Sequence, residues 1–207
     1  MALTTAARIA AALVALIAWS GLVIQLGASR ELTGAAGSAL WEMLRYFTII
    51  ANLLVAILFT AVALGSRRAA SPFLLGGATL AILLVGIVYM LLLRGLLELS
   101  AGALVADILL HKVTPVVVPL WWLAFAPKGG LGARDPWLWA LLPLAYFAYA
   151  LARGAQDSRY PYPFMNVTQL GWGQTLLNAL LMAAGFLIAG YGLLWLDRLF
   201  DGRVRQR

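Results

Sequence analysis

Thr48 and His111 are the residues of this chain whose side chains fit the chemistry of acyl transfer. A hydroxyl that keeps its proton is a weak nucleophile, and an adjacent imidazole, which titrates near neutral pH, can accept that proton. The chain has one histidine, no cysteine and no Gly-x-Ser-x-Gly segment, so the nucleophile must be another hydroxyl. Ser20 and the threonines of the apolar segments are the candidates, and a pair of Thr48 as nucleophile and His111 as base would fit acyl transfer.

The neighbours of His111 in sequence bear on its role. Asp107 precedes it by one helical turn on the same face, where a carboxylate would orient the imidazole, but an aspartate that opens a helix is also a common N-cap. Lys112 points about 100° away around the helix and is expected to extend toward the interface. Pro115 removes the amide that would bond the His111 carbonyl, which predicts a kink. His111 itself fits a base, a proton relay or a hydrogen bond that fixes helix packing.

Two amide side chains are candidates for stabilising the oxyanion of a tetrahedral intermediate. Asn52 follows Thr48 by four residues and shares its helical face, and Asn178 lies in the last apolar segment. The alternative for Thr48 is a hydrogen bond to the carbonyl of Leu44, four residues earlier.

These residues lie in six apolar segments that reach or approach the roughly 20 residues needed to cross a bilayer as a helix. Of the 207 residues, 63% are hydrophobic and 11% are charged, and the mean hydropathy is +0.91. Backbone groups find no water in lipid, so we expect helices, and the alternating pattern of barrel strands is absent. The sequence predicts an all-α, polytopic membrane protein, a six-helix bundle with one domain over residues 1–207. The segments are Arg8–Leu26, Arg45–Leu64, Phe73–Leu93, Asp107–Ala126, Trp137–Ala152 and Thr175–Leu196.

The distribution of basic residues predicts the orientation. With six crossings, nine Lys and Arg residues lie on the side of both termini and five on the other side, where four acidic residues nearly balance them. Basic loops remain in the cytoplasm, so both termini are expected there. The net charge of +7 is then a topology signal, and no nucleic-acid partner is expected. A signal peptide is the alternative for the first segment, although its apolar run is long for one.

Three polar residues are expected at one depth. Thr48, His111 and Asn178 stand about three, four and three residues into segments that all begin on the outer side, which places them roughly 5–6 Å below the outer end of the apolar core at 1.5 Å per residue. Such residues can converge on one site, or they can be unrelated. One histidine and few inward carboxylates offer too few ligands for a metal, and no motif indicates a cofactor, so neither is expected.

Three stretches carry a family resemblance: Leu44–Thr48 followed by Asn52-Leu53, Leu110–Pro115 leading to Pro119-Leu120, and Tyr160–Phe164. Their order and spacing resemble the androgen-induced-gene family, which includes the androgen-dependent TFPI-regulating protein, and in particular its bacterial six-span branch. The resemblance extends over nearly the whole chain. It implies a multi-pass protein of the bacterial inner membrane. It also implies a hydrolase of fatty acid esters of hydroxy fatty acids, with the catalytic threonine at Thr48 and the histidine at His111.

The Tyr160–Phe164 stretch falls in the outer loop, on the side of the expected site. Pro161 and Pro163 stiffen it and favour an extended backbone. Tyr160, Tyr162 and Phe164 would then form a lid that contacts the acyl chains of a substrate. The alternative is a belt of aromatic residues at the membrane interface.

The leading hypothesis is an intramembrane hydrolase whose partner is a membrane lipid or another acyl ester. The alternative is a proton-coupled transporter or lipid-binding membrane protein that uses Asp107, His111 and Lys112, and a third is a structural helix bundle. Gly185 and Ala189, four residues apart in the sixth segment, allow close packing against another span or another chain, so the oligomeric state stays open.

Overall fold

The computed structural model describes residues 3–96 and 101–201, and every regular element in those ranges is a helix. Four residues that entered the charge count, Glu98, Arg203, Arg205 and Arg207, lie outside the described residues. The elements are α1 (Thr5–Thr33), α2 (Ala36–Met43), α3 (Phe47–Ala63), α4 (Pro72–Val88), η1 (Tyr89–Leu93), α5 (Ala101–Ile108), η2 (Leu109–Val113), α6 (Thr114–Phe125), α7 (Asp135–Asp157), η3 (Pro163–Met165) and α8 (Val167–Leu199).

Five helical stretches are long and apolar enough to cross a membrane, and the bent pair α2–α3 would make a sixth. The five are Thr5–Thr33, Pro72–Leu93, Gly102–Phe125, Asp135–Asp157 and Val167–Leu199. The predicted segment Arg45–Leu64 matches α3 to within two residues at each end, and the chain bends by 99° just before it, between α2 and α3. Because α3 begins only at Phe47, Thr48 is the second residue of its first turn.

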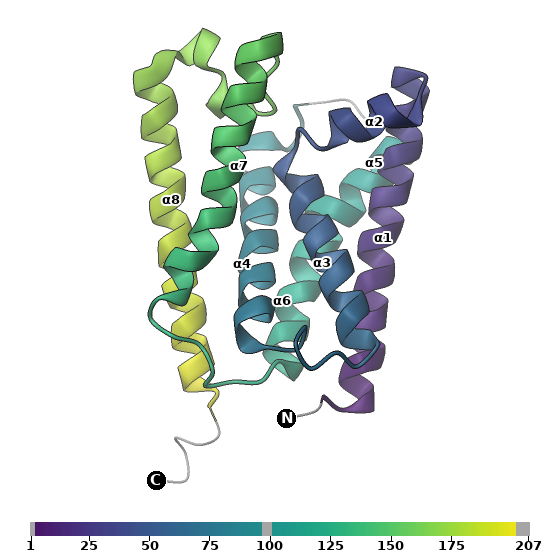
Figure 1. Ribbon diagram of the computed structural model, residues 1–207, viewed down its shortest axis with the longest axis vertical. Coiled ribbons are helices and arrows are strands. Elements are labelled where there is room, and N and C mark those ends of the chain that lie inside the picture. Colours follow the sequence, from purple (N-terminus) through teal and green to yellow (C-terminus); the bar gives the residue numbers. More distant parts are fainter. Residues whose placement is uncertain (1–2, 97–100, 202–207) are drawn as a thin grey trace.

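The long helices lie alongside one another, and α1 begins at the same end of the bundle at which α8 ends (Figure 1). Helix α1 packs against α3, α5 and α6, and α4 packs against α3, α6, α7 and α8. Helices α7 and α8 form a pair on one side of α4 (Figure 1). Helix α4 therefore connects the two parts of the bundle, and a side chain on its outer half can reach both.

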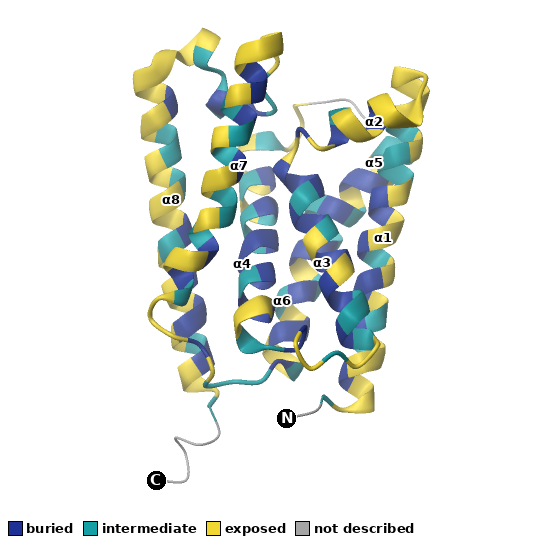
Figure 2. Ribbon diagram, viewed as in Figure 1, coloured by how far each residue is buried: buried dark blue, intermediate teal, exposed yellow. Residues whose placement is uncertain are grey.

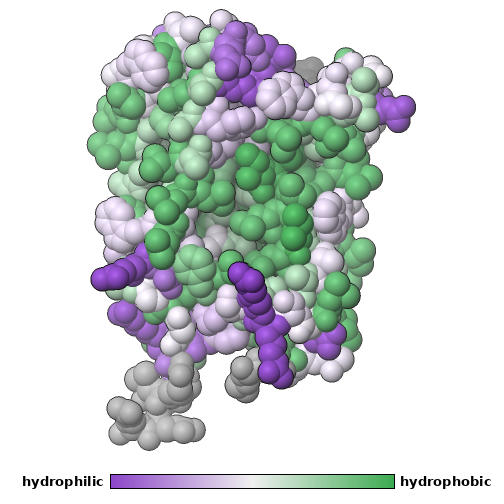
Figure 3. All heavy atoms as spheres, viewed as in Figure 1, coloured by the Kyte–Doolittle hydropathy of each residue, from purple (hydrophilic) through white to green (hydrophobic). Residues whose placement is uncertain are grey.

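The outward faces of the long helices are apolar, as a lipid-facing surface requires. On α8, for example, Leu180, Ile188 and Trp195 are all more than 60% exposed. The buried residues line the faces that meet inside the bundle (Figure 2), where Ala11, Ala51, Ala56 and their neighbours allow α1 and α3 to approach closely. Hydrophobic residues occupy the middle of the visible face, and hydrophilic residues gather toward its two ends (Figure 3).

Candidate active site

Thr48 and His111 meet in the half of the bundle opposite the two termini (Figure 1). The Thr48 hydroxyl oxygen lies 3.1 Å from Nε2 of His111, within hydrogen-bonding distance. Thr48 stands in the first turn of α3, directly after the bend, and His111 stands in the middle of η2. Thr48 is buried, and about a fifth of the His111 side-chain surface is exposed. The hydrogen bond to the carbonyl of Leu44, considered from the sequence, is not the one that Thr48 makes.

A single wide turn presents the imidazole to α3. In η2 each backbone amide donates its hydrogen bond to the carbonyl five residues earlier, as the Thr114 amide does to the Leu109 carbonyl. In this register the Leu110 carbonyl would have to accept from Pro115, which has no N–H. Asn52 supplies the missing donor: its Nδ2 lies 3.2 Å from the Leu110 carbonyl and 2.9 Å from the Thr48 carbonyl. The kink predicted from Pro115 therefore takes the form of a π turn that Asn52 ties to α3.

Asp107 stands on the other side of the ring. Its Oδ1 lies 3.0 Å from Nδ1 of His111, one turn earlier on the same helix. The distance is short, but the angle is not that of a hydrogen bond and Nδ1 has no hydrogen-bond partner among the described residues. The nearby carboxylate nevertheless favours the tautomer that carries its proton at Nδ1, which leaves the Nε2 lone pair for the Thr48 hydroxyl. Asp107 is buried inside the helix rather than at its first turn, because α5 already begins at Ala101. The N-cap alternative for Asp107 therefore does not apply.

Tyr89 completes the surroundings of the imidazole, and the sequence reasoning did not single it out. Its hydroxyl donates to Oδ2 of Asp107 at 2.7 Å, and its ring stacks on that of His111 with centroids 4.5 Å apart. The only signal in the sequence was a tyrosine within an apolar segment, whose hydroxyl needs a partner when buried. Lys112 also turns toward this group, with Nζ 3.4 Å from Oδ2 of Asp107, although its side chain is 40% exposed.

An apolar cavity of about 310 Å³ opens beside Thr48. It lies between α4, α7 and α8, beneath the segment that contains η3, and its size is near the lower end of the range for small-molecule sites. Thr48 and Tyr162 contribute hydroxyl groups to a wall that is otherwise almost entirely hydrocarbon. The apolar part of that wall is formed by residues such as Leu84, Val88, Phe147, Phe164 and Met182.

The three aromatic residues of the outer loop do not share one position. Tyr162 and Phe164 line the cavity and stack on each other, with centroids 5.1 Å apart. Tyr160 instead packs against Gly154 of α7, at a distance that leaves no room for a Cβ, and does not reach the cavity. Burial raises the pKa of the Tyr162 hydroxyl, and its contacts with Thr48 act in the opposite direction. Tyr162 is thus a protonated donor beside the threonine.

Asn178 is not beside Thr48. Helix α8 begins at Val167 but is broken at Gly171, whose φ of 71° is not helical, so Asn178 lies about two turns past the break rather than three residues into the helix. Its Nδ2 donates to the Phe164 carbonyl at 3.0 Å. Asn178 therefore holds the loop that covers the cavity. The Asn52 amide donors are likewise both engaged with carbonyls, which leaves neither amide group directed at an oxyanion.

The first turn of α3 offers other donors. The bonds of this helix begin with Ile49, whose amide donates to the Tyr46 carbonyl. The amides of Phe47 and Thr48 precede that point and have no carbonyl within the helix to bond; both adjoin the Tyr162 hydroxyl oxygen, to which they can donate. Such amides, together with the positive end of the helix dipole, favour a developing negative charge.

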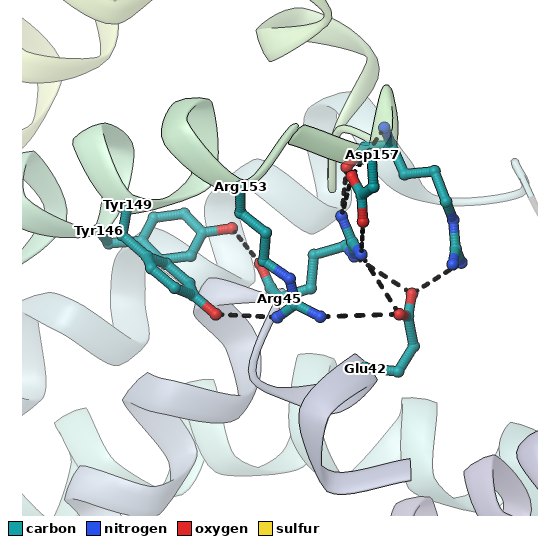
Figure 4. A network of polar contacts seen from close by, with 7 residues as sticks. Glu42, Arg45, Tyr146, Tyr149, Arg153 and Asp157 are labelled. Carbon is teal, nitrogen blue, oxygen red and sulfur yellow. Dashed lines mark hydrogen bonds and ion pairs between the residues drawn. The ribbon is translucent and has the colours of Figure 1, made fainter. Parts of the chain in front are cut away.

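A network of charged residues holds the bend that precedes Thr48 (Figure 4). Arg45 is buried in the bend and pairs with Glu42 and with Asp157 of α7. The Tyr146 hydroxyl donates to the Arg45 carbonyl at 2.8 Å. These contacts fix α7 to the start of α3 and so set the position of Thr48 relative to the cavity.

Within the described ranges, no three His, Cys, Asp or Glu side chains are grouped so that they could hold a metal ion. No protein-family model matches the sequence, and searches of curated proteins and of solved structures likewise gave no match.

Proposed function

We propose that this protein is an intramembrane hydrolase of lipid esters, with Thr48 as nucleophile and His111 as base. The observation that carries the proposal is the 3.1 Å distance between the Thr48 hydroxyl and Nε2 of His111, beside an apolar cavity. Asp107 at the opposite ring nitrogen supplies the third element of a nucleophile–base–carboxylate arrangement. Substrates of the proposed class are fatty acid esters of hydroxy fatty acids and similar acyl esters.

The first half-reaction acylates the threonine. The Thr48 oxygen attacks the ester carbonyl carbon while His111 takes the hydroxyl proton at Nε2. The negative charge that develops on the carbonyl oxygen is stabilised by the Phe47 and Thr48 amides and by the Tyr162 hydroxyl. The intermediate then collapses, the bond to the alcohol oxygen breaks, and His111 returns the proton to the departing alcohol.

The second half-reaction releases the acid. A water molecule gives a proton to His111 and attacks the acyl-threonine carbonyl, and the intermediate expels the Thr48 oxygen, which recovers its proton from His111. Asp107 stabilises the imidazolium that forms twice in each cycle. Tyr89 and Lys112 hold that carboxylate in place through its Oδ2 atom.

The cavity accounts for a lipid substrate. Its wall is almost entirely hydrocarbon from α4, α7 and α8, which matches an acyl chain, and the Thr48 hydroxyl is part of that wall. Residues on its rim, Leu141 and Leu144 of α7, are more than half exposed on the outward apolar surface. A lipid would therefore enter sideways from the bilayer and place its ester at Thr48.

The proposed setting is a cell membrane, the bacterial inner membrane, which the chain crosses six times. In this arrangement the bent pair α2–α3 counts as one crossing. Helix α3 by itself is about 25 Å long at 1.5 Å per residue. Both termini then lie in the cytoplasm, with the loop basic residues Arg67, Arg68, Lys128 and Arg134 on the same side. The site lies near the outer face.

The test is ester turnover by purified protein in detergent or bilayers. Thr48→Ala and His111→Ala are each expected to reduce the rate by at least about 10²-fold, as the loss of a nucleophile or general base does. Thr79→Ala is the matched control, because Thr79 is also a buried helical threonine, bonded to the Leu75 carbonyl. Turnover that survives both active-site substitutions would overturn the proposal.

A proton-coupled transporter is the second candidate. It is favoured by the connected chain of titratable groups, in which Lys112 and Tyr89 contact Asp107 and Asp107 contacts His111. A proton flux into proteoliposomes that depends on His111, without ester turnover, would support this function. The apolar wall of the cavity favours hydrolysis.

A further inference from the structure

Arg153 of α7 is a buried cation with incomplete partners. Its side chain is 5% exposed, and its one hydrogen bond is to the neutral hydroxyl of Tyr149, at 2.8 Å. Nε and Nη2 have no hydrogen-bond partner among the described residues, and the carboxylate of Glu42 approaches Nη2 only to 3.8 Å. A buried guanidinium with unsatisfied donors is costly, so the fold retains it for a reason other than stability.

The neighbouring carboxylates are already committed. Glu42 pairs with Arg45 and with Arg159, and Asp157 pairs with Arg45 through both oxygens (Figure 4). The network therefore contains three guanidinium groups and two carboxylates. The surplus positive charge falls on Arg153, which is the arginine with the weakest pairing.

Arg153 stands on the same face of α7 as a wall of the cavity. Tyr146, which lines the cavity, precedes it by seven residues, or two helical turns, a rise of about 10 Å. Tyr149, the hydrogen-bond partner, lies between them. On the outer side the guanidinium is covered by the ring of Trp41, 4.0 Å away, and Trp41 is itself 58% exposed. A ligand that displaces Trp41 would meet Arg153 directly.

We propose that Arg153 binds an anionic oxygen group, a carboxylate or phosphate, on the lipid whose ester lies at Thr48. The inference rests on the proposed function and narrows its substrate class to esters with an anionic group. A guanidinium can donate two parallel hydrogen bonds to such a group, and Nε and Nη2 are the pair left unused. The acyl chain would fill the cavity while the anion is held about two helical turns above it, near the outer interface.

The alternative role for Arg153 is structural, as a clamp between Tyr149 and Trp41. The two roles differ in what substitution changes. A clamp affects all substrates and overall stability alike, whereas an anion site affects only substrates that carry the anion.

The first experiment compares a matched pair of esters, a hydroxy-fatty-acid ester with a free carboxylate and its methyl ester. The wild type is expected to prefer the free carboxylate in kcat/KM. Arg153→Gln is expected to lower kcat/KM for that substrate by roughly 10–100-fold, which is the effect of losing a charge-assisted hydrogen bond. The kcat/KM for the methyl ester is expected to stay unchanged. Arg153→Lys keeps the charge and should retain part of the preference. Arg30→Gln is the matched control, because Arg30 is exposed at the end of α1 and takes no part in the Glu42 and Asp157 network. Equal losses for both esters would overturn the inference.

The second experiment measures binding without turnover. Palmitate, methyl palmitate and inorganic phosphate are titrated calorimetrically into Thr48→Ala protein in detergent, with and without Arg153→Gln. Palmitate is expected to bind tightly only when Arg153 is present, and methyl palmitate to bind weakly to both. The assignment to an anionic lipid would be overturned if palmitate bound equally well with and without Arg153. It would also be overturned if inorganic phosphate bound to the Arg153 site as tightly as palmitate. Intact Arg153-dependent binding without any ester turnover would overturn the proposed hydrolysis alone.

Discussion

The ring of Tyr89 lies nearly parallel to the imidazole of His111, with an interplanar angle of 20° and centroids 4.5 Å apart. The same tyrosine donates its hydroxyl to the carboxylate of Asp107, which contacts the imidazole at its edge. One residue of η1 thus fixes both the plane of His111 and the carboxylate that orients it. Tyr89 touches no reacting atom in the proposed mechanism and is a positioning residue.

Tyr89→Phe keeps the stacked ring and removes the hydroxyl. Asp107 retains Lys112 but loses its shortest hydrogen bond, so the imidazole is held less firmly. We expect kcat for ester hydrolysis to fall roughly tenfold with KM unchanged, as for an interaction made mainly in the transition state. Tyr191→Phe is the control, because that hydroxyl bonds Trp137 and the Ala133 carbonyl away from the site. A change in KM alone would indicate that Tyr89 contacts substrate instead.

Asp107→Asn tests the orientation of the base. The amide cannot stabilise the imidazolium and favours the wrong tautomer, so kcat is expected to fall by about 10²–10⁴-fold. In the wild type, the rate should rise with pH as His111 loses its proton and then level off, because only the neutral imidazole accepts the Thr48 proton. Steady-state rates across pH, with Glu31→Gln as control, check both expectations. An Asp107→Asn enzyme with the wild-type rate and pH profile would exclude this role.

Gly86→Ala tests the packing beneath the site. A Cβ at Gly86 would lie 2.6 Å from Cβ of Pro115, where α4 crosses α6. The two helices would have to separate, which is expected to cost about 1–3 kcal/mol of stability. Gly185→Ala in α8 is the matched control, since nothing lies within 4 Å of its added Cβ. Thermal unfolding in detergent should show a lower midpoint for the first variant only, and equal midpoints would contradict the close contact.

The absence of cysteine in the sequence allows the orientation to be tested with single cysteines. Gln156 and Arg67 are both exposed, but the proposed orientation places only Gln156, near the end of α7, outside the cell. Gln156→Cys should therefore react with a membrane-impermeant maleimide in intact cells. Arg67→Cys, in the turn between α3 and α4, should react only after the membrane is opened. The reverse pattern would place both termini outside the cytoplasm.

Much of the helical architecture follows from local sequence. The apolar segments are long enough that helices are their only stable form in lipid, and the segment that contains His111 matches its described helix to within about five residues at each end. The start of α3 was predicted to within two residues, but the bend before it was not predicted, because it is held by Arg45, whose partner Asp157 is far along the chain. Helix α8 starts earlier than the predicted segment, because a short, less apolar helical stretch precedes the break at Gly171.

The sequence by itself determined the helix-forming segments and the chemical types available for catalysis, because hydrophobic length and side-chain identity are local properties. Only the tertiary structure decided which residues meet. The contact of Thr48 with His111, the addition of Tyr89 to Asp107, and the separation of Asn178 and Tyr160 from the site depend on how helices rotate and pack. Those rotations are set by long-range contacts, such as that between Asn52 and the Leu110 carbonyl, which no local pattern encodes.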